Sequence, residues 1–298
     1  MSGTDFFGRL RTGLTLTKDS VGVIMDHPRL LVFPLLAAGS SIVFFIVLFF
    51  PLAIAGVVGG GLEYLFLFVL YFATTFVSTF FTAALVHAAN ETFHGREPSI
   101  RDSTQAITGK LEPIATWSAV AATVSILLRI LENSDNPLAS VLRSVFAVGW
   151  SVLTFFIIPV LVFEDVTITS MFKRSGAVFT DTWGETIGTG FGVTGVVIAV
   201  GAGLVVAAVL LSVPIAAVFP GLGLLLTVML VALAVTFSYV LSQTIWGIAK
   251  AALYVYAEEG IVPSQFENFD FETLGGRADH TANVGQTPAE AVKQLSDD

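Results

Sequence analysis

The chain has 298 residues, of which 54% are hydrophobic and only 12% are charged, and its mean hydropathy is +0.83. A soluble domain needs more polar surface, so this composition predicts an integral membrane protein. The net charge of −9 provides no basic patch for phosphate backbones, so we expect no nucleic-acid partner. Cysteine is absent, which excludes disulfides, thiolate metal sites and cysteine nucleophiles, and no motif requires a cofactor.

The N-terminal segment predicts an amphipathic helix and not a cleavable signal. Apolar residues recur on one helical face at Phe7, Leu10, Leu14 and Val21, with charged residues on the other faces. Pro28 then breaks the helix before the first long apolar stretch. The segment is too long and too acidic for the charged region of a signal peptide, so we expect it to lie in the membrane interface.

Long apolar runs predict five membrane spans, and a sixth, at 114–131, is weaker. The weak run ends near Arg129, whose long side chain reaches the headgroups. Counting it leaves only Arg129 and Arg143, of 14 Lys and Arg residues, outside the cytoplasm. We therefore predict an all-α bundle in the plasma membrane with both termini cytoplasmic. The six predicted spans are 30–58, 62–90, 114–131, 141–163, 187–213 and 222–256.

A short pattern occurs three times, each time shortly before a pair of spans. It reads basic, Asp or Arg, Ser, two small or polar residues, then two apolar residues, at 18–24, 101–107 and 173–179. Units of one interfacial helix plus one hairpin predict a ring about a pseudo-threefold axis, because two-span units keep their orientation. We expect the motif serines to occupy equivalent positions and to serve helix packing or backbone hydrogen bonds. These serines are Ser20, Ser103 and Ser175.

Acidic residues end the second, fourth and sixth predicted spans, at Glu91, Glu164 and Glu258. They either pair with the basic residues that open the motifs or only anchor the helix ends at the interface; the anchoring interpretation is favoured.

His87, Glu91 and His94 are spaced four and three residues apart, so they share one helical face at the inner end of the second span. The pattern contains the Glu-x-x-His spacing of carboxylate-bridged metal helices. Such sites need further ligands from other helices, yet the matching part of the sixth span offers only Glu259. Polar residues at the interface are the favoured interpretation, so we expect no metal, and a metal site is the alternative.

Two polar stripes are candidates for the lining of a path through the bundle. Tyr239, Gln243 and Lys250 share a face of the sixth span, while Thr79 and Thr82 form a milder stripe on the second. Polar residues at this depth usually face the bundle interior or a water-filled cavity. Hydrogen bonding between helices, with Lys250 reaching toward the interface, is the favoured alternative.

Residues 1–272 are predicted to form one membrane domain, followed by a disordered acidic tail at 273–298. Acidic residues accompany every predicted cytoplasmic segment, and lysine is scarce among the basic residues. Such surfaces stay hydrated when salt screens charge interactions, which indicates a salt-loving source and favours an archaeon.

The segment His27-Pro28-Arg29-Leu30-Leu31-Val32-Phe33-Pro34-Leu35-Leu36, with Pro159-Val160-Leu161-Val162-Phe163-Glu164-Asp165 and Lys173-Arg174-Ser175, resembles a family of uncharacterised prokaryotic membrane proteins abundant in halophilic archaea. The resemblance covers about residues 5–272 and implies six spans without an assigned activity. A looser similarity is to membrane domains that accompany glycerophosphodiesterases, whose hydrolase domain has no counterpart in this sequence.

We expect a non-enzymatic membrane protein that organises membrane lipid or a cytoplasmic protein partner through its interfacial helices and tail. The alternative is a permease or channel for a small solute or ion. A ring like that of mitochondrial carriers shares the three hairpins, but the Pro-x-Asp/Glu-x-x-Lys/Arg motif is absent. A water-accessible cavity on the axis would favour transport, whereas a plug of apolar side chains would favour the scaffold.

Overall fold

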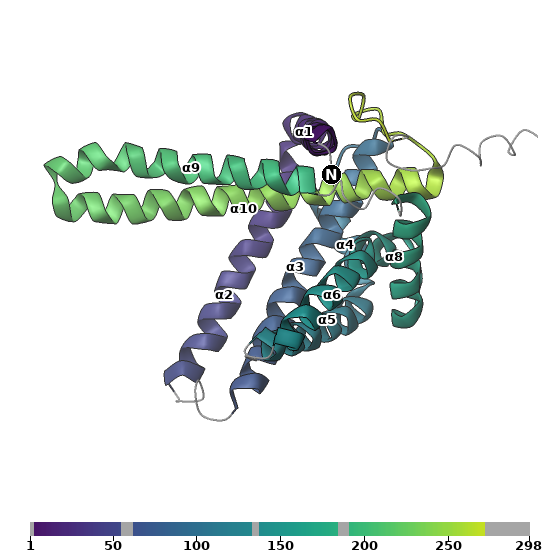
Figure 1. Ribbon diagram of the computed structural model, residues 1–298, viewed down its shortest axis with the longest axis horizontal. Helices are drawn as coiled ribbons and strands as arrows, with labels where there is room; N and C mark the ends of the chain where they lie inside the picture. Colours follow the sequence, from purple (N-terminus) through teal and green to yellow (C-terminus); the bar gives the residue numbers. More distant parts are fainter. Residues whose placement is uncertain (1–2, 55–61, 133–136, 184–190, 272–298) are drawn as a thin grey trace, which may run out of the picture.

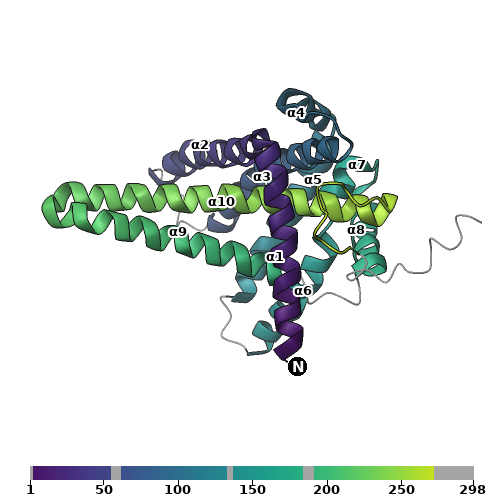
Figure 2. The ribbon, with the colours of Figure 1, turned by 90° about the horizontal axis from the view of Figure 1, so that it is seen from above.

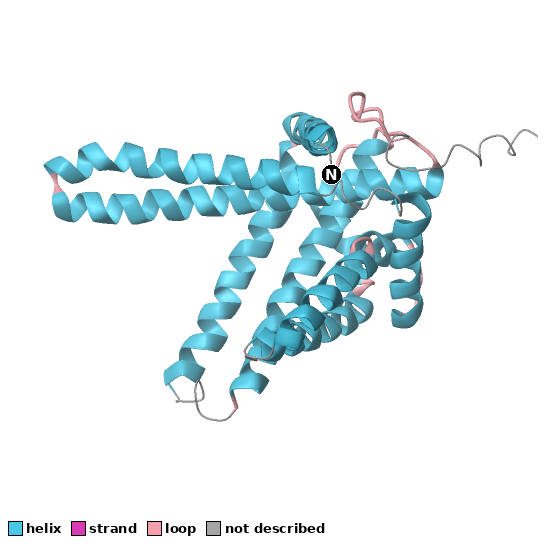
Figure 3. Ribbon diagram, viewed as in Figure 1, coloured by secondary structure: helices cyan, strands magenta, loops and turns pink. Residues whose placement is uncertain are grey.

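The computed structural model describes residues 3–54, 62–132, 137–183 and 191–271, and every regular element in these ranges is a helix (Figure 3). The elements are α1 (Gly3–Asp26), the 3-10 helix η1 (Pro28–Leu31), α2 (Val32–Ile54), α3 (Glu63–Phe93), α4 (Ile100–Thr108), α5 (Leu111–Glu132), α6 (Pro137–Thr154), α7 (Ile157–Phe163), α8 (Ile168–Trp183), α9 (Phe191–Val218) and α10 (Pro220–Glu259).

Five helical segments are long and apolar enough to cross a membrane, so the chain is a multi-pass membrane protein. They include the run at 114–131 that the sequence marked as weak. The predicted fifth span falls on α9, in which the apolar stretch Ile198–Pro214 is shorter. The count of six spans therefore stays a prediction. The five segments are Pro28–Pro51, Glu63–Phe93, Leu111–Glu132, Ser140–Phe163 and Gly223–Glu259.

Each of α1, α4 and α8, which we call the leading helices, precedes a pair of long helices. The pairs are α2 with α3, α5 with α6, and α9 with α10, and the pair α9–α10 projects away from the other two (Figure 1). Seen from above, α1 crosses α10 (Figure 2). The leading helix α4 packs on α3, α8 packs on α6 and α7, and α1 packs on α9 and α10.

The inner ends of α3 and α10 meet α7 in a packed apolar core. Leu85, Leu161 and Ile248, one from each helix, are at most 2% exposed. Alanines on α3 and α10 surround these contacts and let the backbones approach. We call this region the hub, and it comprises α1, η1, α4, α7, α8, residues 83–93 of α3, residues 244–259 of α10 and the C-terminal segment 260–271.

The remaining long helices, which we call the arms, expose large apolar side chains. Phe50, Leu210 and Leu225 are each about 64–65% exposed. Helix α10 belongs to both regions: its 40 residues span about 60 Å, twice the thickness of a hydrocarbon core. Its large exposed apolar side chains lie between Leu224 and Tyr239. The lipid-facing part of α10 therefore has about the length of one membrane span.

A helix break separates α6 from α7, near the kink that Pro159 predicts. Proline lacks an N–H, and its ring clashes with the carbonyl four residues earlier, which here belongs to Phe155. The helix stops at Thr154 and restarts at Ile157. The Phe156 N–H, which has no helical partner at this break, donates to Ser175 Oγ of α8 at 3.0 Å.

The C-terminal segment folds back over the hub. Gly260 ends α10 with a positive φ of 68°, a conformation that glycine adopts without strain. Phe266, Phe269 and Phe271 are then at most 4% exposed. Asn268 donates to the Asp19 carboxylate from its backbone N at 3.2 Å and from Nδ2 at 2.8 Å. The segment thus ties α1 to the end of α10, while the predicted tail at 273–298 lies outside the described residues.

Candidate functional site

The three motif serines are all buried in the hub, with exposures of 0%, 1% and 0%. Each lies on the inner face of a leading helix, where a small side chain permits close packing. Their hydrogen bonds differ, however. Ser20 Oγ donates to Leu16 O at 2.8 Å, Ser103 Oγ lies 3.3 Å from His87 Nδ1, and Ser175 Oγ accepts from Phe156 N.

The basic residue two positions before each serine points outward. Lys18, Arg101 and Lys173 are exposed, because two residues along a helix correspond to roughly 200° of rotation. In the described ranges no carboxylate lies within 4.0 Å of these three side chains. The leading helices therefore combine a buried serine with an unpaired external cation.

Arg174, next to the third of these cations, is used internally. Its Nε donates to Glu164 Oε1 at 2.9 Å and its Nη2 to Glu258 Oε2. The Tyr254 hydroxyl also donates to Glu164. The hydrogen bond that Arg174 donates to Glu164 is the main cause that raises the pKa of Arg174. This network joins α8 to the ends of α7 and α10. Glu164 and Glu258 thus pair with Arg174, the second motif residue, and not with Lys173, which opens the motif.

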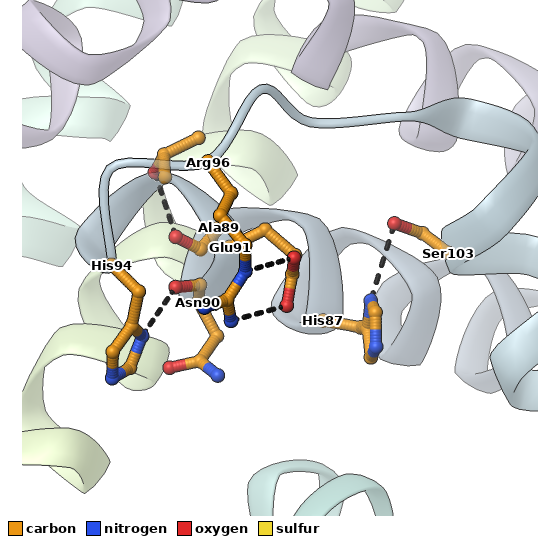
Figure 4. Close-up of polar contacts among 8 residues, drawn as sticks. His87, Ala89, Asn90, Glu91, His94, Arg96 and Ser103 are labelled. Carbon is orange, nitrogen blue, oxygen red and sulfur yellow. Dashed lines mark hydrogen bonds and ion pairs between the residues drawn. The ribbon is translucent and has the colours of Figure 1, made fainter.

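The third span-ending acid, Glu91, pairs within its own loop (Figure 4). Its two oxygens accept from Arg96 Nε at 2.5 Å and from Nη2 at 2.7 Å. This hydrogen bond raises the pKa of Arg96. The arrangement closes the turn after α3. Both oxygens of the Glu91 carboxylate are used by Arg96 in this bidentate pair.

The two histidines on either side of Glu91 have separate partners. His94 Nδ1 lies 2.9 Å from Asn90 O and His94 Nε2 lies 3.5 Å from Glu259 Oε2, whereas His87 faces Ser103 (Figure 4). The described part of the chain contains no group of three or more His, Cys, Asp or Glu side chains positioned to hold a metal ion. The shared helix face thus does not gather His87, Glu91 and His94 around one point.

The polar stripe of α10 lies beside the break between α6 and α7. Lys250 Nζ is 4.9 Å from the centre of the Phe155 ring and 5.9 Å from that of Trp246. Among the residues that the structure describes, no carboxylate lies within 4.0 Å of Lys250. Gln243 is partly buried and Tyr239 is 42% exposed.

The threonine stripe of α3 does not join this polar stripe. Thr79 is 4% exposed and Thr82 is partly buried. No hydrogen bond between described residues connects either threonine to the polar stripe of α10. The helices instead meet through an apolar contact, because a Cβ added to Gly247 would lie 2.5 Å from Leu85 Cδ2. Among the described residues, no hydrogen bond thus joins the two predicted walls of a path.

A cleft of about 380 Å³ lies between the α4–α5 corner and the α7–α8 connection. Lys110 lines it and donates to Asp165 Oδ1 at 2.6 Å and to Glu164 O at 3.2 Å. Hydrogen bonding to Lys110 lowers the pKa of Asp165. No pattern in the sequence identifies Lys110 as a partner for Asp165, because the two are 55 residues apart and a lysine at a helix corner has no distinguishing pattern.

In a comparison with known proteins, residues 61–264 match DUF6159, a family of unknown function, and this range includes the second and third copies of the motif. No curated protein matches the chain. No solved structure matches it either.

Proposed function

We propose that the chain, which belongs to the DUF6159 family of unknown function, is a non-enzymatic scaffold of the plasma membrane. In this proposal it has six spans in three repeated units. In this proposal α1, α4 and α8 lie in the cytoplasmic interface and organise anionic lipid, or a cytoplasmic protein partner that carries the same kind of charge. The observation that carries the proposal is the division of the basic side chains into two sets.

One set forms ion pairs within the described chain. Arg96, Lys110 and Arg174 each pair with a carboxylate. The other set, Lys18, Arg101 and Lys173, sits at one motif position on three separate helices and points outward without such a partner in the described ranges. Cations on amphipathic helices bind phosphate headgroups, each contributing about 1 kcal/mol near an anionic surface. Such an array suits a lipid surface better than one small substrate.

The packing of the hub also supports a scaffold. Leu85, Leu161 and Ile248 fill the meeting point of α3, α7 and α10. Apolar packing at this place supports a scaffold over a water-filled path. The three leading helices pack on the helices that meet here, α4 on α3, α8 on α7 and α1 on α10.

The contact of α1 with the C-terminal segment supports the proposed topology. Asp19 and Asn268 are hydrogen-bonded to each other, so the C-terminal segment lies against α1. The chain has no cysteine, which permits single-cysteine labelling of living cells. We expect Glu63→Cys, at the start of α3, to react in intact cells and Ser264→Cys to react only after the cells are opened. The reverse pattern would contradict the topology.

The lipid role is testable with spin-labelled lipids in reconstituted bilayers. We expect the full chain to immobilise more spin-labelled phosphatidylglycerol than phosphatidylcholine. The triple variant Lys18→Gln, Arg101→Gln and Lys173→Gln is expected to lose most of this preference. The matched control Lys18→Arg, Arg101→Lys and Lys173→Arg keeps the charges and is expected to keep the preference. An equal preference in the Gln variant would rule out lipid organisation by these cations.

A permease or channel is the second candidate, favoured by the lack of a carboxylate partner for Lys250 among the described residues. A path would use Tyr239, Gln243 and Lys250 of α10 with Thr79 and Thr82 of α3. Flux of ions and small organic acids into proteoliposomes tests it. The scaffold predicts no protein-dependent flux, whereas flux that Gln243→Leu reduces at unchanged thermal stability would establish the permease instead.

A further inference from the structure

Helix α10 presents one face on which the chemistry of the side chains changes in a fixed order. From the hub outward, the face carries a cation, Lys250, then an indole, Trp246, then an amide, Gln243, and a phenol, Tyr239. The same face continues with apolar residues that are 52–65% exposed. These are Val235, Val228 and Leu225. All these positions follow one another at helical spacings of three, four or seven residues.

The place where the order changes coincides with the expected edge of the hydrocarbon region. The large exposed apolar side chains of α10 begin at Leu224 and end at Tyr239, a length of about 24 Å at 1.5 Å per residue. Beyond Tyr239 the helix is covered by the hub. Tyrosine and tryptophan are typical of the boundary between lipid tails and headgroups. Lys250 therefore lies at the level of the headgroups and not in the middle of the bilayer.

The surroundings of Lys250 Nζ favour the binding of an anion. The amine lies near the rings of Phe155 and Trp246, 4.9 and 5.9 Å from their centres. Ring faces attract a cation but do not neutralise it. Helical side chains point toward the N-terminus of their helix, which places the amine one turn closer to Gln243 than its Cα. A partly buried charge of this kind is stabilised by a counter-charge, and no carboxylate of the described chain supplies one.

We propose that this face of α10 binds one membrane phospholipid, with the phosphate on Lys250 Nζ, the glycerol oxygens near Gln243 and Tyr239, and the chains along the apolar residues beyond. The sequence of phosphate, glycerol oxygens and hydrocarbon in such a lipid matches the sequence of cation, hydrogen-bond donors and apolar surface on the helix. A free phosphate would use only Lys250. The site lies outside the leading helices and does not depend on the scaffold proposed for them.

Native mass spectrometry of the full chain in detergent, with added phosphatidylglycerol, measures this site directly. We expect one lipid per chain to stay bound, and Lys250→Gln to weaken that binding about tenfold, the effect of losing one charge-assisted hydrogen bond. Lys250→Arg is expected to retain the lipid. Arg143→Gln, which removes a cation of α6 that pairs with Glu132 and belongs to neither proposed lipid site, serves as the matched control and is expected to leave this lipid bound.

Three results would overturn the proposal. One is equal retention by wild type and Lys250→Gln, with both proteins showing the same thermal unfolding. Another is equal retention of diacylglycerol, which has no phosphate. The third is displacement of the lipid by millimolar inorganic phosphate, which would indicate a site for a free anion. If Lys250→Gln does not fold, Gln243→Leu provides the second variant, and an unchanged lipid affinity in it would count against contact with the glycerol region.

Discussion

The hub and the arms share α3 and α10 but are built from different apolar residues. In the hub half of α3 and α10, alanine recurs at positions with almost no exposure, and the helices touch closely. In the arm half of α10 the apolar residues include leucine, valine, methionine and phenylalanine that are half or more exposed. Both halves carry apolar residues, but the size of the apolar side chain differs, because small residues permit helix contact and large ones contact lipid. The hub alanines are Ala83, Ala84, Ala88, Ala89, Ala249, Ala251 and Ala252.

The sharpest way to test this comparison is to truncate one leucine in each region. Leu161 is 2% exposed in α7, and Leu210 is 64% exposed in α9. Leu161→Ala leaves a cavity and is expected to lower the free energy of unfolding by about 3 kcal/mol. Leu210→Ala is expected to change it by less than about 0.5 kcal/mol. Denaturant or thermal unfolding in one detergent gives both values. Equal losses would erase the distinction between hub and arm.

Two glycines provide the opposite test, in which a methyl group is added. A Cβ at Gly247 would lie 2.5 Å from Leu85 Cδ2, whereas nothing lies within 4 Å of a Cβ at Gly203 in α9. Gly247→Ala is expected to destabilise the protein by about 2 kcal/mol through overpacking. Gly203→Ala is expected to be neutral or mildly stabilising, because alanine favours the helix. A compensating Leu85→Ala that restores part of the loss in Gly247→Ala would place the clash at this contact. If the two changes show no coupling, the clash does not lie at this contact.

Two of the motif serines allow a comparison of hydrogen bonds within the hub. Ser175 accepts from the N–H of Phe156, which precedes α7, whereas Ser20 donates to Leu16 O of its own helix. Ser175→Ala leaves a buried N–H without its partner and is expected to cost about 1–2 kcal/mol. Ser20→Ala is expected to cost a few tenths of a kcal/mol, because the Leu16 carbonyl keeps its helical bond. Thermal unfolding compares the two. The same loss in both variants would mean that packing, and not the hydrogen bond, sets the role of these serines.

The smallest expected effect concerns the pH dependence of the ion pair at the cleft. Hydrogen bonding to Lys110 lowers the pKa of Asp165 in the folded protein. A carboxyl with a lowered folded pKa stabilises the protein above its unfolded pKa of about 4, and this contribution is lost as the pH falls through the lower folded value. The stability difference between wild type and Lys110→Met is therefore expected at neutral pH and to shrink in acid. A difference that stays constant from pH 7 to pH 2 would contradict this assignment.

The sequence predicted the elements of the fold better than their contacts. The apolar runs indicated the long helices, Pro28 and Pro159 marked the breaks around η1 and α7, and the motif placed an amphipathic helix before each pair. Helical periodicity also predicted that the serines face inward. The six-span count, the internal repeat and the salt-loving source stay predictions, because none of them is decided by helix positions alone.

The partners of the polar residues could not be predicted, because they depend on how the helices converge. His87, Glu91 and His94 share a face, yet each partner comes from a different element or loop. Arg174 and Glu258 are 84 residues apart, and no pattern in either segment identifies the other. The sequence shows that the stripe of α10 is polar. The contact of Lys250 with Phe155, however, depends on the helix break near Pro159. Periodicity along one helix gives a side chain's direction and leaves its neighbour undetermined.

Helix α10 runs without a break from the outer tip of its arm to the hub, with no proline after Pro220. A continuous α-helix is stiff over this length, so a change in the tilt of its lipid-facing half moves its hub half as one lever. Bilayers of different thickness change the tilt of spans that are longer or shorter than the hydrocarbon layer. The close contact of Gly247 with Leu85 lies near the boundary of the two halves. We therefore expect a change in membrane thickness to change the spacing of the leading helices.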